Sequence, residues 1–199
     1  MVVALTFSRD GDARLMLAYA RGDADAFERL YRKHKGGLFR FFLRQCGNQA
    51  LAEELFQDVW VRVINAREQY EAKANFTTWI YRIAHNILVD HYRKPVEEPL
   101  PEAEIPASRR DDPEVIVSGQ EKLARYRSML RALPDDQREV FLLKEEGGMS
   151  LMEIAGITGE NFETVKSRLR YAVSKLKQAL SETEREPESN DGQRQTHTL

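Results

Sequence analysis

A run of prolines and acidic residues divides the chain and excludes a single continuous fold. Five of the seven prolines lie between positions 95 and 113, and proline removes a backbone donor and disfavours helix in the residue before it. Residues 95–122 also hold eight acidic side chains against three basic ones. These residues are predicted to form an extended linker between two small domains, residues 1–94 and 123–181. The polar residues 182–199 are predicted to form a disordered tail.

The two predicted domains are mildly basic, although the whole chain has a net charge of -2. The one cysteine, Cys46, excludes an intrachain disulfide framework. No apolar run approaches the length of a membrane-spanning helix, and the apolar start before Asp10 is too short for a secretion signal. The chain is therefore predicted to be cytoplasmic.

Both domains have helical periodicity and neither shows the alternation of a strand, so the predicted fold class is all-α. In the first domain Asp23 is predicted to cap a helix that the glycine pair at 36–37 interrupts or bends. Asn48 is predicted to cap the next helix, whose apolar stripe leaves its polar residues on the opposite side. A third helix is predicted over about residues 76–92.

The second domain has the pattern of a helix-turn-helix. One helix is predicted after Pro134, and Ser150 with Glu153 forms a capping-box pattern before a short helix. Gly159 is predicted to supply a turn and Asn161 the cap of the last helix. Two helices joined by a glycine turn, the second with a basic outer face, are typical of this motif.

The last helix is predicted to enter the major groove of DNA. It carries five basic residues and one acidic residue between positions 161 and 177. Side chains near the N-terminus of such a helix reach base edges, which here are Glu163, Thr164, Lys166 and Ser167. A solvated basic face is the alternative interpretation, and for Glu163 the alternative is a favourable interaction with the helix dipole.

A second unusual segment, NFTTWIYRIAHNILVDHYRK, interleaves aromatic, basic and amide side chains. Proteins bind single-stranded nucleic acids by stacking the bases on aromatic side chains and by placing basic side chains along the phosphate backbone. Phe76 and Thr77 are predicted to be exposed at the start of the helix, with Trp79 and the aliphatic residues in the core. The alternative is that the whole segment serves core packing.

No catalytic constellation stands out. The carboxylates within residues 53–58 lie on a polar helix face without a histidine or cysteine pattern. His85 and His91 are six residues apart and therefore do not stack on one helix face as metal ligands would. The sequence predicts a protein that is not an enzyme and that holds no metal or cofactor.

The order of these pieces resembles the extracytoplasmic-function (ECF) group of sigma-70 factors, the promoter-recognition subunits of bacterial RNA polymerase. AEELFQDVWVRV resembles region 2.2, which docks on the polymerase clamp, and NFTTWIYRIAHNILVDHYRK resembles regions 2.3 and 2.4, which open and read the −10 element. LRALPDDQREVFLLKEEGGMSLMEIAGITG resembles region 4.1, and ETVKSRLRYAVSKLK resembles region 4.2, which reads the −35 element. The resemblance covers about residues 20–94 and 120–180.

The resemblance implies three partners: core RNA polymerase, promoter DNA and an anti-sigma factor that holds the protein inactive. The implied polymerase-binding residues are Glu54, Gln57, Asp58 and Arg62. Those implied at the −10 element are Phe76, Thr77, Arg82, Asn86, Arg93 and Lys94. Those implied at the −35 element are Glu163, Thr164, Lys166, Ser167, Arg168, Arg170 and Lys175. Two other classes remain open: a dimeric helix-turn-helix regulator that acts without polymerase, and a helical adaptor with no DNA role.

Overall fold

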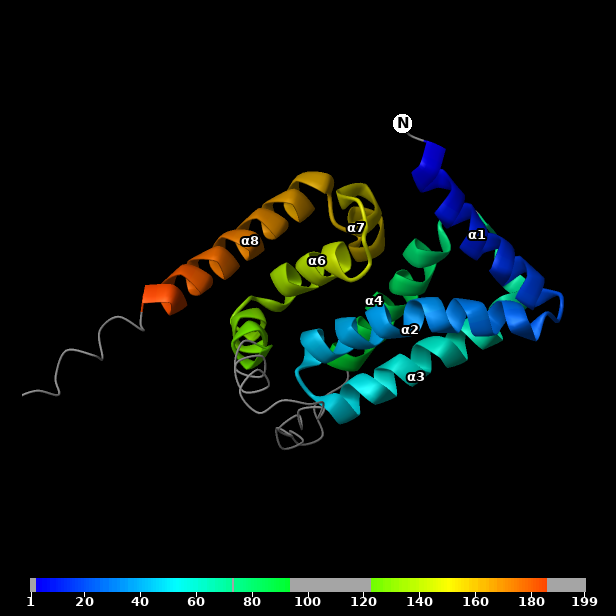
Figure 1. Ribbon diagram of the computed structural model, residues 1–199, viewed down its shortest axis with the longest axis horizontal. Coiled ribbons are helices and arrows are strands. Elements are labelled where there is room, and N and C mark those ends of the chain that lie inside the picture. The colour runs from blue at the N-terminus through cyan, green and yellow to red at the C-terminus, as the bar shows by residue number, and fades with distance from the viewer. Residues whose placement is uncertain (1–2, 73, 94–122, 186–199) are drawn as a thin grey trace, which may run out of the picture.

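The computed structural model describes residues 3–72, 74–93 and 123–185, and all regular elements in these ranges are helical (Figure 1). The N-terminal helices are α1 (Val3–Ala20), α2 (Ala24–Cys46), α3 (Gln49–Asn65), the short 3-10 helix η1 (Arg67–Gln69) and α4 (Phe76–Arg93). The C-terminal helices are a helix at residues 123–131, α6 (Asp135–Glu145), α7 (Leu151–Thr158) and α8 (Phe162–Arg185). The predicted all-α class is confirmed for these residues, and the predicted linker lies outside them.

The predicted helix caps are confirmed. Asp23 Oδ1 accepts a hydrogen bond of 3.1 Å from the backbone N–H three residues on, and Asn48 Oδ1 accepts one of 3.0 Å. Asn161 Oδ1 caps α8 in the same way, at 2.8 Å. Each side chain satisfies a backbone donor that has no partner inside its own helix. These caps place the starts of α2, α3 and α8 where the sequence predicts them.

The predicted interruption at the glycine pair is wrong, because α2 is continuous from Ala24 to Cys46. Glycine weakens a helix by about 1 kcal/mol relative to alanine, but α2 packs against both α1 and α3. Gly37 instead allows a close approach. A Cβ atom there would lie 3.1 Å from Tyr81 Oη and 3.3 Å from the carbonyl oxygen of Glu146.

The N-terminal helices pack around an aromatic core, and the buried carboxylate of Asp12 joins α1 to α2. Trp60 of α3 meets Tyr31 of α2 edge-on, with 4.9 Å between ring centroids. Asp12 of α1 bonds Lys33 at 2.7 Å and His34 at 3.0 Å, both on α2. Burial raises the pKa of the Asp12 carboxyl, but His34 and Lys33 outweigh this effect and hold the pKa below its ordinary value. The ion pair thus fixes α1 on the bundle.

The C-terminal helices form a second, smaller packing unit. α6 packs against α8, and α7 contacts both. Val165, Ala172 and Leu176 give α8 its buried side. α8 continues to Arg185, past the predicted end at Ser181, because extending a formed helix needs no new nucleation. The end of α8 projects away from the rest of the chain (Figure 1).

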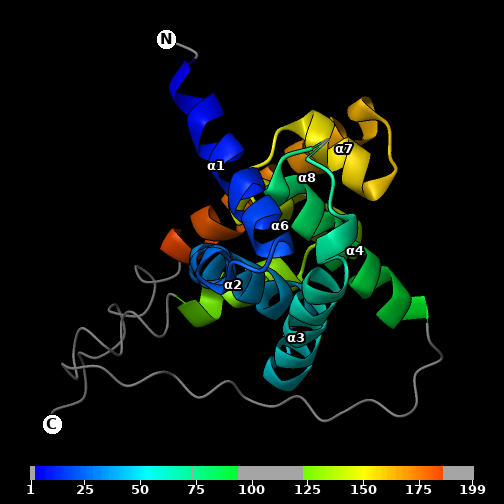
Figure 2. The same cartoon turned by 90° about the vertical axis from the view of Figure 1, so that its right-hand side faces the viewer.

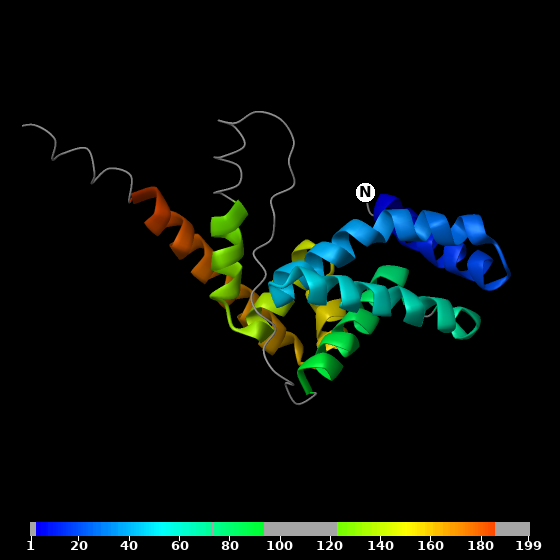
Figure 3. The ribbon, with the colours of Figure 1, turned by 90° about the horizontal axis from the view of Figure 1, so that it is seen from below.

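The two sets of helices pack against each other. α6 contacts α2, and α7 contacts α4 (Figure 2). Figure 3 shows α8 on one side of the molecule and α1 on the other, with α7 and α4 between them. Buried apolar residues from both sets belong to one core cluster. The described residues therefore form a closed arrangement in which the two packing units share an interface.

Candidate functional site

The outer face of α3 is a polar surface around one apolar residue. Glu54, Gln57, Asp58 and Arg62 are all exposed, as their helical phase predicts. Sequence reasoning missed Val61, whose side chain is 53% exposed. Val61 lies three residues after Asp58 and four after Gln57, so it shares their face. We call this group the α3 surface.

The prediction that Phe76 is exposed is wrong. Its side chain is fully buried at the start of α4, and its ring centroid lies 5.1 Å from that of His34 and 5.7 Å from that of Trp79. The cause is helical phase: Phe76, Ile80 and the later buried positions of α4 share one face toward the core. In this conformation the ring cannot stack on a base. Thr77 beside it is half-buried.

The other predicted −10 residues lie on the outside of α4 where they are described. Arg82 and Asn86 are exposed and one turn apart, and Arg93 is exposed at the end of the helix. Lys94 lies outside the described residues. Arg82 is engaged within the chain, since its Nη2 donates a 2.9 Å hydrogen bond to the carbonyl oxygen of Gly156 on α7.

Two donors at the start of α4 were not predicted as site residues. Asn75 Nδ2 and Thr78 Oγ1 each donate a 2.9 Å hydrogen bond to Glu153 Oε1 on α7. Both residues belong to the aromatic segment, but the sequence alone gives no sign that they face a carboxylate 75 or more positions away. They extend the polar face of α4 toward its N-terminus.

Glu153 uses its two carboxylate oxygens for different partners. Oε2 accepts from the Ser150 backbone N–H at 2.9 Å and from Ser150 Oγ at 2.7 Å, which confirms the predicted capping box. Oε1 accepts from Asn75 and Thr78. Burial raises the pKa of Glu153, but the hydrogen bonds from Ser150 and from the two α4-side donors outweigh it and lower the pKa to about 2. The carboxylate is therefore ionised at neutral pH.

The start of α8 presents a charged pair to solvent. The Glu163 side chain is 73% exposed, and one of its oxygens lies 3.3 Å from Nζ of Lys166, which is 59% exposed. Thr164 and Ser167 are half-buried, while Arg170 and Lys175 further along the helix are exposed. An exposed, mainly basic helix after a tight turn suits insertion into a DNA groove. We call this group the α8 surface.

Arg168 stands apart from the other basic residues of α8. Its Nε lies 2.8 Å from Asp136 Oδ2 on α6, and its Nη1 lies 3.0 Å from Glu160 Oε1 in the turn before α8. Its side chain is 24% exposed. Arg168 therefore joins α6 to α8 in this structure, whereas the sequence groups it with residues that contact DNA.

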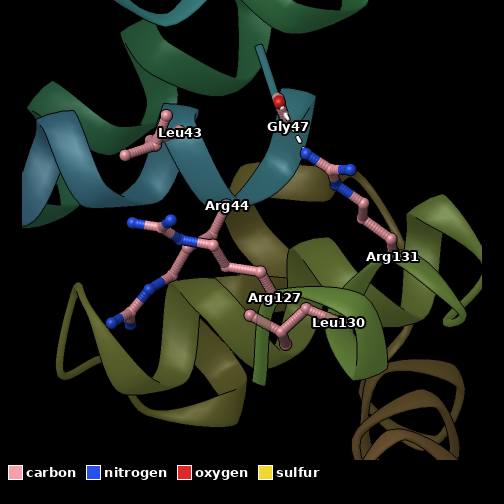
Figure 4. Close-up of a pocket in the computed structure, with 6 residues that line it drawn as sticks. All are labelled: Leu43, Arg44, Gly47, Arg127, Leu130 and Arg131. Carbon is pink, nitrogen blue, oxygen red and sulfur yellow. Dashed lines mark hydrogen bonds between the residues drawn. The ribbon is translucent and has the colours of Figure 1, made fainter. Parts of the chain in front are cut away.

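A small pocket lies where the end of α2 meets the helix at residues 123–131. Leu43, Arg44, Gly47, Arg127, Leu130 and Arg131 line it (Figure 4). Arg131 Nη2 donates a 2.8 Å hydrogen bond to the carbonyl oxygen of Gly47, and a Cβ atom on Gly47 would lie 2.8 Å from Arg131 Nε. The pocket is therefore part of the packed junction between the two sets of helices.

Neither a metal-binding cluster nor a membrane-spanning helix is found among the described residues. Among residues 3–72, 74–93 and 123–185, no group of three or more histidine, cysteine or acidic side chains is placed to hold a metal ion. No helix in these ranges is long and apolar enough to cross a membrane. α7, the turn at Gly159 and α8 form a helix-turn-helix, the motif of a class of DNA-binding proteins, and the N-terminal helices that pack against it carry polar surfaces of their own.

Comparison with known proteins identifies the family. The models for sigma-70 region 2 and sigma-70 region 4 match residues 30–95 and 123–176. The ECF RNA polymerase sigma factor RpoE of Cereibacter sphaeroides is 34% identical over 163 residues, which cover 80% of this chain and 88% of the relative. RNA polymerase sigma factor CarQ of Myxococcus xanthus is 31% identical over 176 residues, 86% of this chain and 98% of the relative.

Solved structures agree with this assignment. CnrH, solved in complex with the cytosolic domain of CnrY, has a TM-score of 0.65 at 27% identity, covering 86% of this chain and 98% of that chain. The sigma factor RpoE of Bartonella quintana, solved with the anti-sigma factor NepR, shares the fold with a TM-score of 0.63 at 24% identity, over 78% of this chain and 96% of that chain. The chain belongs to the sigma-70 family, in its ECF group.

Proposed function

We propose that this protein is a sigma factor that binds core RNA polymerase and directs it to promoters by contacting the −10 and −35 elements. The observation that carries the proposal is the exposed α8 surface after the capped turn, on a chain that matches sigma-70 regions 2 and 4 in order. The protein supplies recognition and the polymerase supplies the chemistry, so the chain itself is not an enzyme. Its place of action is the cytoplasm.

The α3 surface is the proposed polymerase contact. Glu54, Gln57, Asp58 and Arg62 are exposed, while the other side of α3 is needed for the core. Val61 adds an apolar centre that suits a protein partner better than water. Charged groups around an apolar centre give specificity and fix the register of the contact.

The outer face of α4 is the proposed −10 contact. Arg82, Arg93 and Lys94 are assigned to backbone phosphates, and Asn86 to a base edge. Thr77 lies at the start of α4, on the N-terminal side of these residues. The buried ring of Phe76 packs this end of the helix against the core. Reading a base in a melted strand needs polar groups for its edges in addition to cations for its backbone. Asn86 is an exposed amide on the outer face of α4, one turn after Arg82, and would supply such a polar group.

The α8 surface is the proposed −35 contact. Glu163 would accept a hydrogen bond from a cytosine amino group, the donor that the major groove offers to a carboxylate. Lys166, Thr164 and Ser167 lie within the same two turns and would contact neighbouring bases. Arg170 and Lys175 are assigned to phosphates, where they contribute affinity to all sequences alike.

Regulation by an anti-sigma factor is part of the proposal. Its support is the similarity to CnrH, which was solved in complex with the cytosolic domain of another protein. Such a partner would compete for surfaces that polymerase or DNA use. Residues 186–199, which hold three acidic side chains and one basic one, are not assigned a role.

Open-complex formation tests the proposed function. Core polymerase, this protein and a promoter fragment are combined, and permanganate detects unpaired thymines near −10. We expect reactivity only when both proteins are present, and a strong loss for Asn86→Ala. The matched control is Asn65→Ala, an exposed asparagine at the end of α3, which should melt the promoter normally. Tight, sequence-specific duplex binding by the chain alone, with no effect of polymerase, would instead identify a stand-alone regulator.

A further inference from the structure

Tyr171 is an aromatic residue on the basic, solvent-facing side of α8. Among the described side chains of this helix, three large apolar ones are exposed: Phe162, Tyr171 and Leu180. Phe162 lies three residues before the buried Val165, and Leu180 lies four after the buried Leu176, so both continue the apolar stripe at its ends. Tyr171 has no such spacing to the stripe. Its side chain is 53% exposed, and core packing does not explain it.

Tyr171 lies in one row with Glu163 and Ser167. The three residues are spaced by four and four, so they follow one another along the same side of α8. Eight residues of helix span about 12 Å, and base pairs in DNA are stacked about 3.4 Å apart. When Glu163 contacts one base pair in the major groove, Tyr171 therefore lies about three or four base pairs away from it.

Two basic residues flank the Tyr171 ring. The Arg170 guanidinium lies 5.2 Å from the ring centre, within the range of a cation–π interaction. Lys175 follows one turn after Tyr171 and is exposed. Under the proposed function both cations contact phosphates, and phosphate contacts fix the register and orientation of a protein on the duplex. The ring is therefore held between two points at which α8 is anchored to DNA.

The chemistry of a phenol ring selects one feature of the major groove. Each base pair presents donors and acceptors there, and thymine alone adds an apolar group, its C5 methyl. A ring edge that packs on this methyl removes apolar surface from water. The same ring over cytosine would cover the amino group and leave a donor without a partner, which is unfavourable. An aromatic side chain at this position therefore favours thymine.

We propose that Tyr171 is a specificity-determining residue at the −35 element: its ring packs on the methyl group of a thymine about three or four base pairs from the pair that Glu163 contacts. This inference rests on the proposed function, because it needs α8 in the major groove at −35. Glu163 and Tyr171 then select bases at the two ends of one row, and Arg170 and Lys175 supply affinity that does not depend on sequence.

The first measurement is selection of promoters by the holoenzyme. Core polymerase with this protein selects from a library whose −35 element is randomised, and the bound DNA is sequenced. We expect the wild-type protein to enrich thymine at one position. Tyr171→Ala should lose this preference and keep the others, whereas Tyr171→Phe should retain it because the ring remains. Both variants should melt like the wild type, since the side chain lies outside the core.

The second measurement removes the methyl group from the DNA. Deoxyuridine replaces thymidine at the selected position, which keeps the base pair and deletes only the methyl. Affinity of the wild-type holoenzyme should fall by about three- to fivefold, the change expected for one buried methyl group. Tyr171→Phe should show the same fall. Tyr171→Ala should bind the two promoters equally, because the partner of the methyl is gone.

Lys175→Ala is the matched control on the same helix. It should weaken binding to both promoters alike and keep the ratio between thymidine and deoxyuridine. The inference is overturned if deoxyuridine has the same effect on wild type and on Tyr171→Ala. It is also overturned if Tyr171→Phe and Tyr171→Ala both weaken all promoters without a change of preferred base, since the hydroxyl would then contact a phosphate. A wild-type holoenzyme that enriches no −35 sequence at all would refute the proposed function instead.

Discussion

A substitution of Arg168 distinguishes a structural role for this residue from the DNA-contacting role of other basic residues on α8. The structure gives it two carboxylate partners, Asp136 at 2.8 Å and Glu160 at 3.0 Å, on elements that must stay together for α8 to be presented. Arg168→Ala removes both contacts and leaves the two acids close together without a cation. We therefore expect this variant to lose stability, although its sequence position suggests a loss of DNA affinity alone.

The expected loss of stability in Arg168→Ala depends on how exposed its two ion pairs are to water. A hydrogen bond to a charged group contributes about 1.5–3 kcal/mol when it is protected, whereas fully exposed ion pairs contribute about 0–1 kcal/mol. Asp136 is 47% exposed and Glu160 is 38% exposed, so water screens both pairs. The two together are expected to contribute about 1–2 kcal/mol. For a chain of this length that corresponds to a fall in melting temperature of about 2–8 °C.

The melting temperature of Arg168→Ala, measured by thermal unfolding followed by circular dichroism, tests this prediction, with Lys175→Ala as the control. Lys175 is exposed on the same helix, so its removal should change stability by less than about 0.5 kcal/mol. Lys175→Ala should weaken promoter binding and reduce its salt dependence. If Arg168→Ala melts like Lys175→Ala and reduces the salt dependence equally, Arg168 contacts phosphate and its role as a brace between α6 and α8 is refuted.

Three further predictions address the other surfaces. Asp58→Arg should abolish co-purification with core polymerase while leaving the melting temperature unchanged, and Glu68→Arg, at a site on η1 that is also exposed, should co-purify normally; retained binding by Asp58→Arg would remove the α3 surface from the polymerase contact. Phe76→Ala should cost about 3–5 kcal/mol of stability because it empties a buried site, and a wild-type melting curve would contradict the burial of this ring. Glu163→Ala should change the preferred base at one −35 position, with a loss of discrimination of about 1–3 kcal/mol there; an unchanged preference, measured by selection from a promoter library, would leave Glu163 a role only at the start of the helix.

The sequence predicts those parts of the fold that depend on local chemistry. Caps at Asp23, Asn48 and Asn161 lie where a short polar side chain precedes an apolar periodic run, and the Ser150–Glu153 capping box has both of its hydrogen bonds. These features involve residues three apart, so their geometry follows from helix parameters alone. The exposure of the α3 surface follows in the same way from the phase of its apolar stripe.

Features that depend on distant partners escaped prediction. Phe76 begins a helix, where side chains are often exposed, and its place on the buried face of α4 becomes evident once His34 of α2 is seen packed against it. The two-fold use of Glu153, the closeness of Gly37 to Glu146 and the pairing of Arg168 all join residues from different helices. The charge and periodicity of one helix carry no information about which other helix will cover it. The interface between the two packing units is therefore a finding of the structure.

Sequencing of transcript starts tests the central claim most directly. Core polymerase is incubated with fragmented genomic DNA, with and without this protein, and the 5′ ends of all new RNA are mapped. We predict a set of start sites that appears only with the protein and shares one sequence near −10 and another near −35. Asp58→Arg should erase the set, and Glu163→Ala should replace the shared −35 sequence at one position. Start sites identical to those of core polymerase alone would contradict the assignment of this chain as a promoter-recognition subunit.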